Sequence, residues 1–165
     1  MKSVRSIGLI SLFFVLLLRV QAQEPRSAGD KMPTLRKKVA VTPATYTGRQ
    51  LIIGSGGGFT GAATAYYLFE DGKLFGWRNR DTTFTFIAQQ TPANTKKVFA
   101  TFDEKCKIKT TKFDYPGNTY KLVRWKKGKE IYKVAWGESG KIVPPNYPKF
   151  YDSFMAMIPA SLRLK

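Results

Sequence analysis

One segment of the sequence has residue types and spacing that match a specific chemistry, the glycine-rich stretch at residues 56–61. Its members are Gly56, Gly57, Gly58, Phe59, Thr60 and Gly61, which together satisfy the pattern GxGxxG. In dinucleotide-binding folds such glycines let the backbone approach a pyrophosphate at a helix N-terminus. Apolar residues 51–53 precede the segment, as a strand does in that fold. A flavin or nicotinamide (FAD or NAD) oxidoreductase is therefore one hypothesis for this chain.

The residues that follow the glycines argue against that hypothesis. A dinucleotide fold needs an acidic residue about 20 positions further on to hold the ribose, and residues 74–80 contain none. Residues 62–69 are rich in tyrosine, threonine and phenylalanine and lead into an Asp-Gly pair, which favours a strand and a hairpin over a helix. We therefore expect no cofactor. Gly54 to Ala62 is interpreted as a glycine-rich bend between two strands and as a candidate binding loop.

The side chains that most enzymes use for covalent or metal chemistry are scarce. The chain has no histidine and one cysteine, Cys106, which excludes the usual zinc sites and histidine-activated nucleophiles. Acids that are neighbours on a turn or a helix point in different directions, and the pairs at 70–71 and 103–104 are of this kind. Cys106 is interpreted as a small core residue on a helix. The sequence therefore predicts a protein without catalytic or metal-binding residues.

A second candidate site is a basic hairpin expected over residues 120–136. Basic residues mixed with aromatic rings can bind a glycan or a single strand by charge and stacking. The alternative is an ordinary half-buried hairpin, in which Tyr132, Val134 and Trp136 face the helices and the lysines face water. The cationic candidates are Lys121, Arg124, Lys126, Lys127 and Lys129.

The beginning of the chain has the order of a cleaved secretory signal. A positively charged start is followed by an apolar run over residues 7–18 and by small residues at Val20 and Ala22. The run is shorter than the roughly 20 residues of a membrane span, so we expect no transmembrane helix after cleavage. The prediction is a signal peptide over 1–22 and a protein that is exported to the periplasm or secreted.

The charge of the chain indicates which partners to expect. The formal net charge is +17, and removal of the three basic residues in the signal leaves +14. Outside the cytoplasm this charge favours an anionic envelope polymer or an acidic protein, and makes nucleic acid an unlikely partner. A solvated basic surface with no single partner is the alternative.

The elements that position both candidate sites follow from the hydrophobic pattern. Residues 23–48 are expected to form a flexible basic leader, followed by one domain over 49–165. Hairpins rather than strand–helix–strand crossovers predict an α+β fold, with a mainly antiparallel sheet and two helices packed on one face. The expected elements are strands at 50–53, 62–69, 74–77 and 84–88, a helix at 92–107, a loop at 114–118, the basic hairpin, and a last helix ending at Pro159.

The combined motifs also support a family resemblance. The segment 56–61, the strand at 66–69 with Asp71-Gly72, and residues 115–118 and 135–137 resemble a group of short exported bacterial proteins of unknown function. The resemblance covers about residues 50–158 and implies no particular activity. A fainter resemblance to emfourin-like metalloprotease inhibitors rests on a strand followed by residues 57–61. The second resemblance implies a protein partner such as a protease, and the net charge implies an anionic envelope polymer. Together with the missing catalytic residues, these observations predict a non-enzymatic binding protein.

Overall fold

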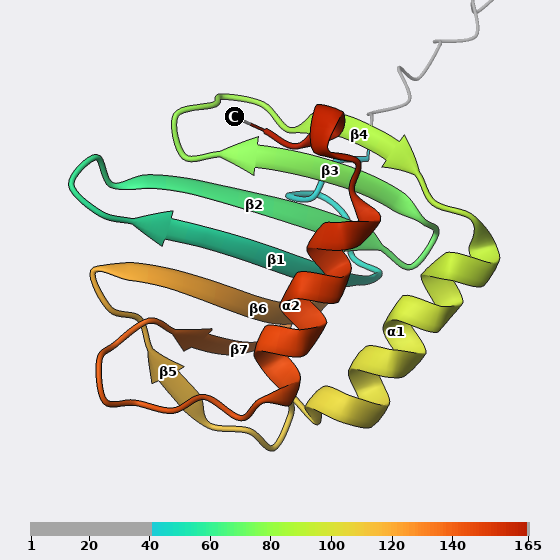
Figure 1. Ribbon diagram of the computed structural model, residues 1–165. Helices are drawn as coiled ribbons and strands as arrows, with labels where there is room; N and C mark the ends of the chain where they lie inside the picture. The colour runs from blue at the N-terminus through green and yellow to red at the C-terminus, as the bar shows by residue number, and fades with distance from the viewer. Residues whose placement is uncertain (1–40, 165) are drawn as a thin grey trace, which may run out of the picture. The chain divides into compact units, whose positions relative to one another are not determined.

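The computed structural model describes residues 41–164 of the chain (Figure 1). The predicted signal peptide and residues 23–40 of the predicted leader lie outside the described residues. The elements in chain order are β1 (Arg49–Gly57), β2 (Ala62–Phe69), β3 (Lys73–Arg78), β4 (Thr85–Gln89), α1 (Pro92–Cys106), β5 (Phe113–Tyr115), β6 (Thr119–Lys127), β7 (Glu130–Trp136), α2 (Asn146–Met157) and the 3-10 turn η1 (Ala160–Leu162).

The strands of residues 41–164 form one mainly antiparallel sheet in the order β4-β3-β2-β1-β6-β7-β5. The first four strands are a meander, and β6 and β7 are a hairpin that joins it through the β1–β6 pair. β5 pairs with β7 in parallel. The predicted loop over 114–118 is therefore corrected, because residues 113–115 form an edge strand. Three residues are too short a pattern to signal a strand before the partner is known.

Both helices pack on the same face of this sheet, which confirms the predicted α+β architecture (Figure 1). Thr91 begins α1 by accepting a hydrogen bond from the Asn94 amide at 3.2 Å, and Pro92 occupies the first helical position. Phe99, Phe102 and Cys106 then recur at helical spacing and are buried against the sheet. The sequence prediction of this helix is correct to within one residue at its end.

The start of α2 is tied to the end of α1. The Tyr147 hydroxyl donates to the Cys106 carbonyl oxygen at 2.6 Å, and the Asn146 side-chain amide donates to the Lys105 carbonyl oxygen at 2.6 Å. The last carbonyl groups of a helix have no hydrogen-bond partner within it, so these two bonds satisfy carbonyl oxygens that would otherwise be unpaired. The end of α1 and the start of α2 are therefore joined directly, and the two helices form one layer on the sheet.

Residues 42–48 belong to the folded part, which corrects the predicted leader boundary. The Tyr46 ring stacks on Phe69 with centroids 4.0 Å apart, and the Gly128 amide donates to the Thr47 carbonyl oxygen at 2.9 Å. Burial, helped by the carboxylates of Glu70 and Asp71, raises the pKa of Tyr46 to about 12. The segment has little apolar periodicity because it packs through one aromatic ring rather than through a repeating face.

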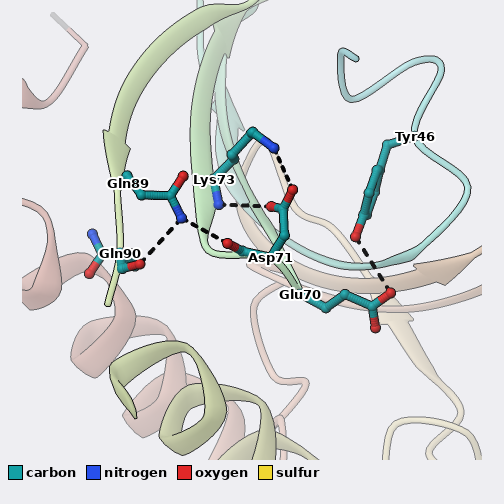
Figure 2. A network of polar contacts seen from close by, with 6 residues as sticks. All are labelled: Tyr46, Glu70, Asp71, Lys73, Gln89 and Gln90. Carbon is teal, nitrogen blue, oxygen red and sulfur yellow. Dashed lines mark hydrogen bonds and ion pairs between the residues drawn. The ribbon is translucent and has the colours of Figure 1, made fainter. Parts of the chain in front are cut away.

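A polar network holds the β2–β3 turn that the Asp-Gly pair predicts (Figure 2). Asp71 accepts a hydrogen bond from the Lys73 amide at 3.1 Å and forms an ion pair with the Lys73 ammonium. The Gln89 side chain donates to the Asp71 carbonyl oxygen at 2.7 Å, which links the turn to the end of β4. On the other side, Tyr46 reaches the Glu70 carboxylate at 3.5 Å. The turn thus fastens both residues 42–48 and β4 to the sheet.

Candidate functional site

β1 extends into the glycine-rich region, so the bend predicted over Gly54 to Ala62 is shorter than expected. β1 continues to Gly57 and β2 begins at Ala62, so only residues 58–61 form the turn between them. The backbone of 54–57 is hydrogen-bonded to β2 on one side and to β6 on the other. The sequence pattern suggested a bend because glycine has a weak preference for strands. The hydrogen bonds to β2 and β6 outweigh that preference.

Gly57 allows a close approach between two backbones. Its φ is +96°, and a Cβ there would lie 2.0 Å from the Asn118 carbonyl oxygen. The neighbouring Gly58 amide donates to the same oxygen at 2.7 Å. The turn that leads into β6 therefore rests directly on the end of β1, and this contact requires a residue without a side chain.

The geometry of a dinucleotide site is not formed at the glycines. Residues 62–69 are the strand β2, antiparallel to β1, as the sequence pattern predicts. Within residues 41–164 the α-helices begin at Pro92 and Asn146, so neither starts at the glycine segment. A pyrophosphate bound there would have no helix N-terminus to face, which the motif needs for its chemistry.

The two candidate sites of the sequence are neighbours in the sheet. β1 and β6 are paired so that Gly56 lies opposite Tyr120, Ser55 opposite Lys121 and Ile52 opposite Arg124. The glycine segment and the basic hairpin therefore form one continuous region, although the paired residues are more than 60 positions apart in the chain. The sequence gives no indication of this pairing.

The five cationic candidates do not share one face. Lys121 lies on the helix side, 3.7 Å from the Asp152 carboxylate and above the Tyr151 ring. Trp125 on the same strand belongs to the core, and alternation places Arg124 and Lys126 on the opposite face. The predicted orientation of Tyr132, Val134 and Trp136 toward the helices is confirmed by their packing in or against the core. Lys127 and Lys129 lie at the hairpin end.

The electrostatics single out four of these five residues. Three lysines on or beside the hairpin are paired: Lys133 with Asp114 at 2.7 Å, Lys109 with Glu130 at 3.8 Å, and Lys121 with Asp152. Among residues 41–164, no ion pair within 4.0 Å involves the remaining four candidates. These are Arg124, Lys126, Lys127 and Lys129, which we call the unpaired basic group.

One end of the sheet projects beyond the helices (Figure 1). A cavity of about 510 Å³ opens there on the helix side and is lined by Ser55, Gly57, Lys121 and Trp136, among others. Phe59 occupies the β1–β2 turn and is fully exposed. The structure therefore brings Gly56 and Gly57 together with Lys121, and leaves the turn residues Gly58, Phe59, Thr60 and Gly61 as a separate tip.

The opposite face of the sheet carries aromatic residues that the sequence analysis does not single out. Tyr67 on β2 and Trp77 on β3 line a second cavity, of about 170 Å³, together with Arg124. Strand alternation is the signal that could have found them, because Tyr67 shares its face with Ala65 and Ala63. Only the register shows that these residues also share a face with the glycines of β1.

Cys106 is a free, buried residue at the end of α1, which confirms its interpretation as a core residue. Burial raises the pKa of its thiol from 9.0 to about 12. A rise of three pKa units lowers the fraction of Cys106 present as the reactive thiolate about a thousandfold at neutral pH. We therefore expect iodoacetamide at pH 8 to leave the native protein unmodified and to label Cys106 fully in guanidinium, measured by intact mass. Rapid labelling of the native protein would contradict this.

Neither helix within residues 41–164 is long and apolar enough to cross a bilayer. The same residues contain no cluster of three acidic or cysteine side chains that could hold a metal ion. A comparison with protein-family models and with curated proteins finds no match for the chain. The resemblance to short exported bacterial proteins stays a prediction.

Proposed function

We propose that this chain is an exported, non-enzymatic binding protein that holds an anionic envelope polymer through the unpaired basic group. The observation that supports the proposal most directly is the distribution of ion pairs. Acidic residues neutralise Lys133, Lys109 and Lys121 nearby, while Arg124, Lys126, Lys127 and Lys129 have no ion pair within residues 41–164. In the part of the chain that the structure describes, no neighbouring carboxylate offsets the positive potential of these four side chains, so they attract an anionic ligand more strongly than paired cations do.

The arrangement of the group suits an extended ligand. Arg124 and Lys126 are two positions apart on β6 and point to the same face. Lys127, which alternation turns to the helix side, and Lys129 extend the line of basic residues along the strand to the hairpin end. A chain of anionic groups can follow this line, whereas a compact anion would meet only one or two of the cations. A polymer of the cell envelope is the anion that an exported protein meets first.

The test is a matched pair of triple charge reversals. Lys126→Glu, Lys127→Glu and Lys129→Glu remove three members of the group, and Lys96→Glu, Lys97→Glu and Lys149→Glu change three exposed lysines on the helices. Each triple changes the net charge by six units. Binding to heparin and to lipopolysaccharide is measured by titration at several salt concentrations, with circular dichroism to confirm the fold.

We expect the hairpin triple to lose about a hundredfold in affinity at low salt, since each basic residue near an anionic surface contributes roughly 1 kcal/mol. The loss should shrink as salt rises, because screening acts within roughly 10 Å at 0.1 M ionic strength. The helix triple should lose much less. Equal losses would mean that only the total charge matters, and the proposal would be wrong.

A second function, binding of a protein partner such as a protease, is favoured by one observation. Phe59 is fully exposed at the tip of the β1–β2 turn, where it could enter a cleft of a partner protein. A single variant distinguishes the two functions. Phe59→Ala leaves polymer binding unchanged if the unpaired basic group is the site, and weakens capture of a protein partner if the tip is the site.

A further inference from the structure

The face of the sheet away from the helices has a depression at its centre. The cavity of about 170 Å³ has a floor made of Gly54, Ala63 and Ala65, which lie next to one another on β1 and β2. The depression exists because Gly54 has no side chain: a Cβ there would contact Leu122 at 3.5 Å and fill the space between the strands. Larger residues surround this floor on both sides.

Three aromatic rings form the walls of the cavity, from Tyr67, Trp77 and Tyr120. Tyr67 packs edge-on against Phe84 with centroids 5.3 Å apart, and the Trp77 indole nitrogen donates to the Asp81 carbonyl oxygen at 3.0 Å. These contacts hold the rings in place before any ligand arrives, so binding costs little side-chain entropy. Fixed rings around a shallow floor offer flat apolar surfaces.

Arg124 lies at the edge of the same cavity and is the one charged residue that lines it. Its Nε is buried and has no hydrogen-bond partner among residues 41–164. The guanidinium can turn toward a ligand without breaking a bond, and it gains the hydrogen bonds that it lacks. A planar guanidinium pairs best with a planar carboxylate, through two parallel hydrogen bonds.

We propose that this cavity binds one uronic-acid unit of an anionic polysaccharide, with the sugar ring against the aromatic walls and its carboxylate paired with Arg124. The volume is below the roughly 300–1,000 Å³ of pockets for drug-sized ligands, which suits a single sugar ring. Lys126 lies two residues after Arg124 on the same face, where it contacts the next carboxylate along the polysaccharide. The inference rests on the proposed function for the polymer, and adds the chemical class of its repeating unit.

The test uses short ligands that cannot span the whole basic group. Trigalacturonic acid and its methyl ester, which has the same shape without the charge, are titrated by calorimetry at 0.15 M salt. Trp77 fluorescence provides a local readout, because Trp125 and Trp136 lie on the helix side. The variants are Arg124→Gln, Arg124→Lys, and Ala65→Val, which fills the floor with a residue that favours strands. The helix triple serves as the control for charge.

We expect the acid to bind and to change Trp77 fluorescence, and the ester to bind at least tenfold more weakly. Arg124→Gln and Ala65→Val should each reduce affinity at least tenfold, and Arg124→Lys should lose part of it because the two-bond geometry is lost. An oligothymidylate is titrated in the same way as a nucleic-acid control. The inference would be overturned if acid and ester bound equally, if the oligothymidylate bound more tightly than the acid, or if Ala65→Val had no effect.

The two proposals fail in different ways. If trigalacturonic acid does not bind while heparin binding still depends on the unpaired basic group, the uronate site is wrong and the proposed function stands. If the acid binds as expected while both triple variants lose heparin equally, the cavity is a sugar site and the proposed polymer surface is wrong.

Discussion

Phe102→Ala is expected to lower the free energy of unfolding by about 3–5 kcal/mol. Phe102 is completely buried, and its ring lies 4.9 Å from that of Phe150, so it joins α1 to α2 above the sheet. Removing the ring deletes buried apolar surface and leaves a cavity that the two helices cannot close. A domain of this size has about 5–15 kcal/mol of stability in total, so the variant loses a large part of it.

Urea denaturation followed by circular dichroism measures this loss as a lower midpoint at an unchanged slope. Phe59→Ala is the matched control, because the same substitution at the fully exposed turn removes no packing. Its effect should stay within about 0.5 kcal/mol. Similar losses for the two variants would mean that the packing between the helices is not as described.

Gly57→Ala is expected to cost about 2–4 kcal/mol, the second largest effect. The φ of +96° disfavours any residue with a Cβ by roughly 1–2 kcal/mol. The new Cβ would also lie 2.0 Å from the Asn118 carbonyl oxygen, so the turn before β6 must move. That movement weakens the hydrogen bond from the Gly58 amide, which is worth about 1 kcal/mol.

Gly61→Ala separates the two causes of that loss. Gly61 also has a positive φ, of +59°, but a Cβ there would meet nothing within 4 Å. This variant should show the conformational cost alone, and thermal denaturation should place its midpoint clearly above that of Gly57→Ala. If both glycines tolerated alanine equally, the close approach between β1 and the turn before β6 would be wrong.

The sequence predicts much of the fold because the local signals agree with the structure. The β-prone residues of β2, the Asp-Gly turn and the Thr-Pro start of α1 each act over a few residues, and each element appears where it is expected. β5 and residues 42–48 were missed because distant partners define them. A three-residue strand exists only beside β7, and Tyr46 is fixed only by its contact with Phe69.

The candidate site could be predicted only in part. Glycine content and charge drew attention to β1 and β6, but not to the fact that these strands are paired. The cationic residues looked like one patch in the sequence, whereas strand alternation sends Lys121 and Arg124 to opposite faces. Tyr67 and Trp77 were missed because an aromatic residue in a strand is usually part of a core, and only strand alternation places them on the face away from the helices.

The pairing of β1 with β6 has a consequence for how the chain folds. The meander β1–β4 and the β6–β7 hairpin are each made of contacts between near neighbours in the chain, and these form quickly. Pairing β1 with β6 closes a loop of about 60 residues. The conformational entropy of this loop is lost before the hydrogen bonds between β1 and β6 can offset the cost. Formation of this central junction is therefore the slow, high-contact-order event, and its glycines let the two preformed halves meet without a side chain in the way.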